Sequence, residues 1–188
     1  AECQTKYNWP EYIQCDTGKN NKPRVLNAAR LVKGAIRLSG SVQTLDSDVL
    51  KNIKRSNISG ESLMQLAVEA AEIDADSRSE IILALPGESL TSHLQTIKAV
   101  ADSGFNHVNT YQLMMLPGTE IDSPETREKY GMKTRFRVLP RCFGYFEVLG
   151  KQVIAAEIEE VCISTNTLPF EDYVKCRKMH LLTHIFHN

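Results

Sequence analysis

One segment, residues 80–85, constrains the fold more than any other, because all of its residues except the first are apolar. Patterns of helical spacing flank it, with apolar residues recurring every three or four positions over 63–73 and again over 90–101. A strand of this kind between two helices is typical of a parallel sheet that is buried on both faces. The segment therefore predicts βα units joined by right-handed crossovers.

The alternation of strand and helix extends along most of the chain. We expect strands at 12–15, 35–41 and 107–115 and helices at 23–33, 46–54, 59–73, 89–103 and 123–131. Four strands are too few to close an eight-stranded barrel, so the pattern indicates half of a barrel or an open α/β sheet. Further on, a short strand at 136–139, an ambiguous segment at 153–165 and a helix at 169–186 are interpreted as a C-terminal extension, 132–188, packed on the sheet.

Length and charge narrow the class of function. The 188 residues predict one domain, and the net charge of −1 excludes a strongly cationic nucleic-acid binder. No apolar run approaches the roughly 18 residues that a membrane-spanning helix needs, and the first residues lack an apolar signal core. We therefore expect a cytoplasmic protein that acts on a small-molecule substrate, with neither a membrane nor a nucleic acid as partner.

The cysteines and histidines do not predict a metal site. The odd number and wide scatter of the cysteines argue against a disulfide framework, and no two are spaced as in zinc or iron–sulfur sites. His180 and His184 would share a helix face and could bind a metal, but solvated or core-rim positions are the favoured interpretation. The five cysteines are Cys3, Cys15, Cys142, Cys162 and Cys176.

Polar residues and Pro-Gly steps follow the predicted strands, at the edge where parallel α/β folds bind ligands. Ser41 and Gln43 lie two apart, where a hydroxyl and an amide can hydrogen-bond a ribose. Gly87 and Gly118 either let the backbone approach a ligand or simply turn the chain. Arg55 either caps the short helix before it or binds a carboxylate bidentately.

Three segments resemble motifs of the radical S-adenosylmethionine (SAM) enzymes. Residues 41–55 contain Gln43 and Arg55, twelve apart, like the family's SAM-contacting pair. Residues 80–88 resemble the family's next strand with its Pro-Gly-Glu ending, and residues 111–120 resemble its adenine-side strand. The resemblance covers about residues 12–121. It implies a partial (βα) TIM-type barrel of parallel strands within 1–131, followed by the C-terminal α/β extension.

The resemblance also implies a set of SAM-binding residues. Gln43 and Arg55 would contact the ribose and methionine parts of SAM, Glu80 would lie beside them, and residues 111–116 would line the adenine. Gln14 falls where many members place an acid that contacts SAM. The residues that we predict to bind SAM are Gln14, Ser41, Gln43, Arg55, Glu80, Tyr111, Met115 and Leu116.

The family's Cys-x3-Cys-x2-Cys loop, which holds its 4Fe-4S cluster, is missing from this sequence. The chain is therefore interpreted as the C-terminal part of the catalytic core, inactive alone, with the cluster ligands upstream; the alternative is a degenerate member that lost the cluster. By resemblance, the intact enzyme converts SAM to methionine and a 5′-deoxyadenosyl radical. Residues 1–60 and 157–160 resemble the branch with an N-terminal cobalamin-binding domain, for which methyl transfer is implied.

Two other functions stay open. A half-barrel lyase or aldolase would need a catalytic Lys or an acid pair at the strand ends, where Lys19 is the only Lys in such a loop. A cluster-free α/β module could instead bind a nucleoside-like ligand or a protein partner. The iron content of the full-length gene product would separate these hypotheses from the radical SAM hypothesis.

Overall fold

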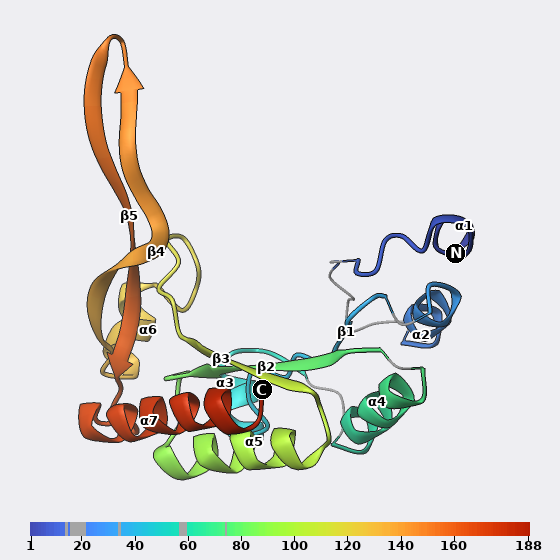
Figure 1. The fold of residues 1–188 in the computed structure, drawn as a ribbon. Helices are drawn as coiled ribbons and strands as arrows, with labels where there is room; N and C mark the ends of the chain where they lie inside the picture. The colour runs from blue at the N-terminus through green and yellow to red at the C-terminus, as the bar shows by residue number, and fades with distance from the viewer. Residues whose placement is uncertain (14, 16–21, 34, 57–59, 74) are drawn as a thin grey trace.

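The centre of the molecule is a parallel sheet with strand order β1-β2-β3. The computed structural model describes residues 1–13, 15, 22–33, 35–56, 60–73 and 75–188. The strands are β1 (Leu38–Ser39), β2 (Ser77–Leu83) and β3 (His107–Gln112). Upstream, Ile13 forms an isolated parallel bridge with Ile36, so the first predicted strand is reduced to a single pairing in the described residues. The predicted α/β class with parallel strands is confirmed (Figure 1).

Helices follow the strands in the predicted order. Local hydrogen bonds explain where two of them begin: the Asp46 carboxylate accepts from the amides of Asp48 and Val49, and the Ser89 hydroxyl accepts from the amide of Ser92. The helices are α1 (Glu2–Tyr7), α2 (Lys22–Leu31), α3 (Ser47–Asn52), α4 (Gly60–Glu72), α5 (Leu90–Asp102), α6 (Pro124–Lys129) and α7 (Phe170–Phe186). None of the helices formed by the described residues is both long and apolar enough to cross a membrane.

Among the described residues, helices cover only one face of the sheet, which corrects the expectation of burial on both faces. Residues of β2 alternate between buried and half-buried, with Ile81 and Leu83 fully buried. Ile81 packs with residues of α4 and α5, which lie on the same side of the sheet (Figure 1), whereas Leu83 packs in a second cluster with residues of α3 and α7. Glu80 and Ile82 belong to the half-buried set and face the open side. The apolar residues of β2 therefore belong to a core on one side of the sheet, and the polar residues of the sheet line its open face.

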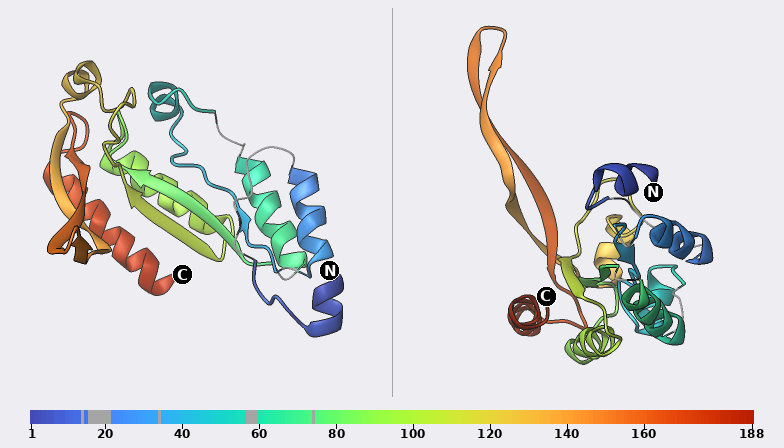
Figure 2. Two further views of the ribbon diagram at one scale, coloured as in Figure 1. Left: turned by 90° about the horizontal axis from the view of Figure 1, so that it is seen from above. Right: turned by 45° about the vertical axis from the view of Figure 1, so that its right-hand side comes forward.

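A long antiparallel hairpin follows the sheet. It consists of β4 (Lys133–Val148) and β5 (Lys151–Ser164), and it extends far from the sheet and helices (Figures 1 and 2). The short strand expected at 136–139 is therefore part of a much longer one. Only the base of the hairpin is buried, where the amide of Met115 donates to the Glu160 carbonyl and the amide of Cys162 donates to the Leu113 carbonyl, each over 2.9 Å.

Candidate functional site

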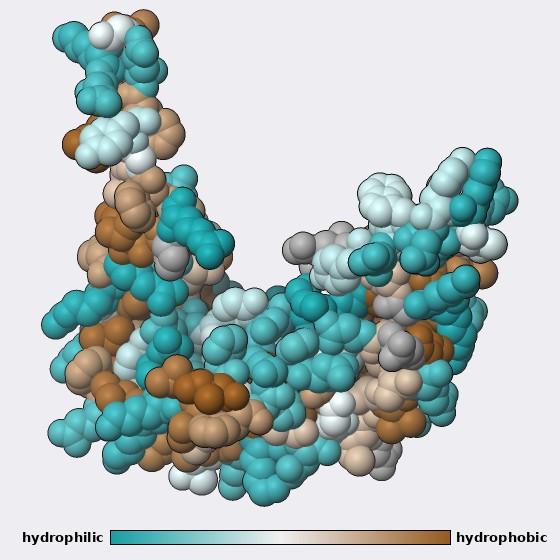
Figure 3. Space-filling view, in the orientation of Figure 1, coloured by the Kyte–Doolittle hydropathy of each residue, from teal (hydrophilic) through white to brown (hydrophobic). Residues whose placement is uncertain are grey.

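The open face of the sheet carries a row of hydrogen-bonded polar side chains. The Ser41 hydroxyl donates to the Glu80 carboxylate over 2.8 Å, and the Ser39 hydroxyl lies 2.9 Å from that of Ser41. The Arg78 guanidinium lies 4.0 Å from the same carboxylate. Ser41 and Glu80, predicted separately, are therefore brought into direct contact. Figure 3 shows that hydrophilic side chains cover the floor of the hollow between the hairpin and the N-terminal segments.

A local irregularity in the backbone places Gln43. Its φ angle is 59°, and the amides of Val42 and Gln43 both donate to the carbonyl of Glu80. The Gln43 carbonyl in turn accepts from the amide of Ile82 over 2.8 Å, so the segment remains joined to β2. Two residues opposite one is the pattern of a β-bulge, which changes the direction of the side chain. The Gln43 side chain lines a cavity at the carboxyl ends of the strands.

This cavity has a volume of about 440 Å³ and contains several of the predicted residues. Apolar side chains form much of its wall, including Ile82, Leu113 and Met114. Cavities at the carboxyl ends of parallel strands are the usual ligand sites of α/β folds. The predicted residues that line it are Gln43, Arg55, Tyr111 and Leu116.

Arg55 reaches the cavity from the segment that follows α3. The amide of Arg55 donates to the Leu50 carbonyl over 2.9 Å, and the Asn52 side chain donates to the Pro86 carbonyl over 3.0 Å. Gly87 allows this second contact, because a Cβ at its φ of 86° would lie 2.5 Å from the Asn52 amide nitrogen. The adjacent Lys54 pairs with Glu120. In the described part of the chain, no carboxylate pairs with Arg55.

The remaining predicted residues divide into three groups. Tyr111 lines the cavity half-exposed, and burial, followed by the nearby charge of Glu80, raises the pKa of its phenol. Leu116 is exposed at the rim, whereas the Met115 side chain is 3% exposed and packs in the core. Met115 can therefore meet a ligand only through its backbone. Gln14 lies outside the described residues.

Two arginines in the wall of the cavity were not foreseen from the sequence. Arg137 of β4 donates to the side chains of Gln112 and Glu159, and Gln112 donates to the hydroxyl of Tyr173. Arg177 of α7 lines the same cavity. Arg177 comes from α7, which packs beside β3, whereas Arg55 comes from the segment after α3, so different elements bring the two arginines to one cavity.

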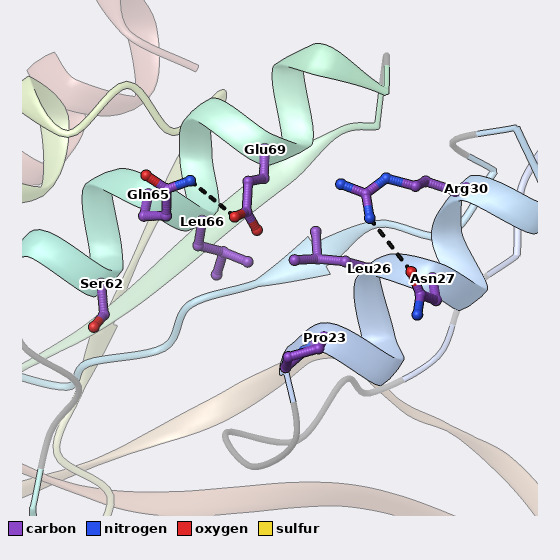
Figure 4. A pocket seen from close by; sticks show the side chains of 8 residues that line it. All are labelled: Pro23, Leu26, Asn27, Arg30, Ser62, Gln65, Leu66 and Glu69. Atoms are coloured by element: carbon purple, nitrogen blue, oxygen red, sulfur yellow. Dashed lines mark hydrogen bonds between the residues drawn. The ribbon is translucent and has the colours of Figure 1, made fainter.

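A second cavity, of about 520 Å³, lies between α2 and α4. Figure 4 shows Leu26 and Leu66 directed toward each other across it, while Arg30 bonds Asn27 and Gln65 bonds Glu69 along their own helices. None of the predicted residues lines this cavity, and it lies away from the carboxyl ends of the strands. The candidate site is therefore the cavity at the strand ends.

Comparison with known proteins gives curated relatives and solved structures, while no protein-family model matches the chain. Over all of this chain, the sequence is 29% identical to the cobalamin-dependent radical SAM methyltransferase TokK of Streptomyces tokunonensis. It is also 29% identical to the 2-(S-pantetheinyl)-carbapenam-3-carboxylate methyltransferase of Streptantibioticus cattleyicolor, again over all of this chain. In both comparisons the match covers 28% of the relative, so the chain spans little more than a quarter of their length.

The heme chaperone HemW of Buchnera aphidicola is 30% identical over 86 residues, which are 46% of this chain and 23% of that protein. The structure of the Escherichia coli radical SAM enzyme coproporphyrinogen III oxidase (HemN) matches with a TM-score of 0.45 and 25% identity, over 58% of this chain and 27% of that one. The curated methyltransferases confirm the resemblance that the motifs of residues 41–55, 80–88 and 111–120 indicated. The chain is therefore related to the radical SAM enzymes and corresponds to a part of their length.

Proposed function

We propose that this chain forms the SAM-binding, C-terminal portion of the catalytic core of a radical SAM enzyme. Its sheet would be one part of a partial (βα) TIM-type barrel, with the open polar face directed inward. One observation carries the proposal: Gln43 and Arg55, the pair that the family resemblance assigns to SAM, line the same cavity at the carboxyl ends of the strands. The intact protein would act in the cytoplasm on a small-molecule substrate.

The lining residues have the chemistry to hold SAM. The Arg55 guanidinium can bind the methionine carboxylate bidentately, and no protein carboxylate among the described residues competes for it. The Gln43 amide can bond ribose hydroxyls. Tyr111 and Leu116 offer flat and apolar surfaces to the adenine. Ser41 and Glu80 extend this polar surface across the sheet, already bonded to each other.

The residues of this chain do not fit the 4Fe-4S cluster. Cys162 and Cys176 are buried in the core, whereas Cys3 and Cys15 are exposed near the other end of the chain, and no three cysteines have the spacing of a cluster loop. Across the described ranges, no group of three His, Cys, Asp or Glu side chains is placed to hold a metal. We propose that a segment outside this chain holds the cluster, and we assign these residues no part in electron transfer.

The reaction outcome that we propose for the intact protein is cobalamin-dependent methyl transfer. The support is the name of one relative, a cobalamin-dependent radical SAM methyltransferase that matches over the whole of this chain, and the name of a second, also a methyltransferase. Cobalamin, when bound, would carry the methyl group. The cavity described above would hold SAM, and its remaining wall would face the substrate.

Calorimetric titration of the chain with SAM and with adenosine tests the SAM site. A charge-assisted bond to a carboxylate contributes about 1.5–3 kcal/mol, so Arg55→Ala should weaken SAM roughly ten- to hundredfold. Adenosine has no carboxylate, and its affinity should not change. Lys54→Ala is the matched control, because it removes the neighbouring cation, which pairs with Glu120 at the exposed surface.

Unchanged SAM affinity in Arg55→Ala would contradict the proposed site. Equal affinity of the unmodified chain for SAM and adenosine would instead support the cluster-free nucleoside-binding module.

A further inference from the structure

A buried chain of hydrogen bonds connects the turn after β2 to α7. The Glu88 carboxylate, which is fully buried, accepts from the amide of Ala84 over 2.7 Å and lies 2.8 Å from Nδ1 of His93. Nε2 of His93 lies 2.7 Å from Nε2 of His180. Nδ1 of His180 lies 3.0 Å from a guanidinium nitrogen of Arg177. Four ionisable side chains from three elements thus form one continuous path.

The chemistry of the guanidinium fixes the direction of every bond in this path. A guanidinium only donates, so Nδ1 of His180 must accept, and its proton must be on Nε2. That proton is donated to Nε2 of His93, which leaves Nδ1 of His93 to donate to Glu88. Burial, followed by the nearby His93 and Arg177, lowers the pKa of His180 to about 3, which agrees with a neutral ring. The chain therefore holds Arg177 in a defined position.

Arg177 stands at the wall of the candidate site, and its positive charge is not neutralised by a neighbour. Arg177 lines the candidate-site cavity. It also lines a third cavity, of about 320 Å³, together with Thr110 and Tyr111. Arg137 and Arg127 have carboxylate partners, but among the described residues no carboxylate pairs with Arg177. A cation that is held in place by a buried network but lacks a counter-ion is suited to bind an anion.

The surroundings of Arg177 limit the kind of anion. The cavity that Arg177 lines is also lined by Ile82, Leu113 and Met114, so the rest of the ligand must be apolar enough to displace water from these side chains. Arg55 lines the same cavity and is already assigned to SAM under the proposed function. A second anionic group in the same cavity would therefore belong to another molecule.

We propose that Arg177 binds a carboxylate or phosphate group of the enzyme's substrate, an organic anion with an apolar body, and that Glu88, His93 and His180 are positioning residues for it. The proposal rests on the proposed function, because it names the substrate class of the same site. It assigns the two arginines of the cavity to two ligands: SAM at Arg55, and the substrate anion at Arg177.

The test uses three probes with one apolar tail: hexanoate, hexyl phosphate and the neutral hexanamide. The affinity of the chain for each probe is measured by calorimetry or NMR titration. A charge-assisted bond contributes about 1.5–3 kcal/mol, so at least one of the two anions should bind at least about tenfold more tightly than hexanamide. The tighter of the two anions identifies the group. In Arg177→Gln both anions should fall to the level of hexanamide, while in Arg55→Ala the preference should persist.

The positioning role is tested by His180→Phe and His180→Gln. Phe cannot accept from Arg177, so the preference for the anion should fall while the affinity for hexanamide, which reports an intact cavity, stays unchanged. Gln has an accepting oxygen and should restore part of the preference.

Equal affinity for all three probes, or an anion preference that survives Arg177→Gln, would overturn the proposal. Because SAM affinity should be unchanged in Arg177→Gln, a failure here is distinguishable from a failure of the SAM site. Arg177 is half-buried at the wall of the cavity, so this variant stays informative even if the His180 variants do not fold.

Discussion

The sheet and the hairpin are both built of strands with many apolar residues, yet they place these residues in opposite environments. In β2, Ile81 and Leu83 are completely buried against helices. In the outer part of the hairpin, Tyr145 is 71% exposed and Ile154 is 72% exposed, although the two are directly paired across the strands. The difference is a covering layer, which the sheet has on one face and the hairpin lacks among the described residues.

This contrast explains where the site is rigid. Gln43 and Tyr111 are placed by parallel strands whose other face is packed, so hydrophobic burial fixes their positions. The hairpin is held by its cross-strand bonds and by its base, because a two-stranded ribbon alone is only marginally stable in water. At the base, Arg127 donates two bonds of 2.8 Å to Glu160, and this ion pair joins α6 to β5.

The largest effect on stability is expected from truncating an isoleucine in the sheet, and it tests whether the sheet is enclosed and the hairpin is not. Ile81→Ala should lower the free energy of unfolding by about 2–5 kcal/mol, because it removes buried methyl groups and leaves a cavity. Urea denaturation of the chain measures the change. Ile81→Val removes one methylene and should cost roughly 0.5–1.5 kcal/mol. A loss below that of Ile81→Val would mean that the helices do not pack on β2 as described.

The second prediction is that acid lowers the stability of the helices packed on the sheet and not that of the hairpin base. The folded-state pKa of His180 is about 3, below the 6.5 of an exposed histidine, so between these values the unfolded chain binds a proton that the folded chain does not. Stability should therefore fall as the pH is lowered from about 7 to 5, by at most about 2 kcal/mol from this group. His180 joins Arg177 to the bonded pair of His93 and Glu88, so the loss should appear in α5 and α7.

The hairpin base should not respond over the same pH range. The bonds from Arg127 and Thr134 hold the pKa of Glu160 at about 2, so its contribution to stability is present above the ordinary carboxylate pKa and is lost only toward pH 2. Hydrogen exchange at pH 7 and pH 5 distinguishes the two regions. His180→Gln should flatten the pH dependence of stability between 7 and 5. An unchanged slope would show that His180 does not govern the response of the helical layer to acid.

The difference between the enclosed sheet and the exposed hairpin also explains which elements could be predicted from the sequence. Helices α3, α4 and α5 and strands β2 and β3 lie within a few residues of their predicted positions, because their apolar spacing reflects a real core and because Asp46 and Ser89 are recognisable caps. The hairpin was predicted only as a short strand at 136–139, because its apolar residues are exposed and do not alternate between core and solvent. Its turn is Leu149-Gly150, both at positive φ, without the Asn-Gly or Asp-Gly signal of such turns.

The motifs pointed to residues that share one cavity, but the hydrogen-bond network behind that cavity could not be predicted from the sequence. Gln43, Arg55, Tyr111 and Leu116 were placed by family resemblance, and all four line the cavity. His93 and His180 contact each other although 87 residues separate them, and no local sequence pattern predicts a contact over such a separation. A signal was nevertheless present. Each histidine occupies a position of its helix's buried stripe, three or four residues from the next buried residue.

The smallest effect is expected at the outer part of the hairpin, and it completes the comparison that Ile81→Ala begins. Ile154→Ala removes the same atoms from a strand, but the side chain is already 72% exposed and its main contact is the cross-strand pair with Tyr145. Such pairs contribute roughly 0.2–1 kcal/mol relative to alanine, so the free energy of unfolding should change by no more than that. Urea denaturation at low protein concentration measures it, with Tyr145→Ala as the partner in a double-mutant cycle. A loss as large as that of Ile81→Ala would show that the outer hairpin is covered in solution, and the contrast between an enclosed sheet and a bare hairpin would then be wrong.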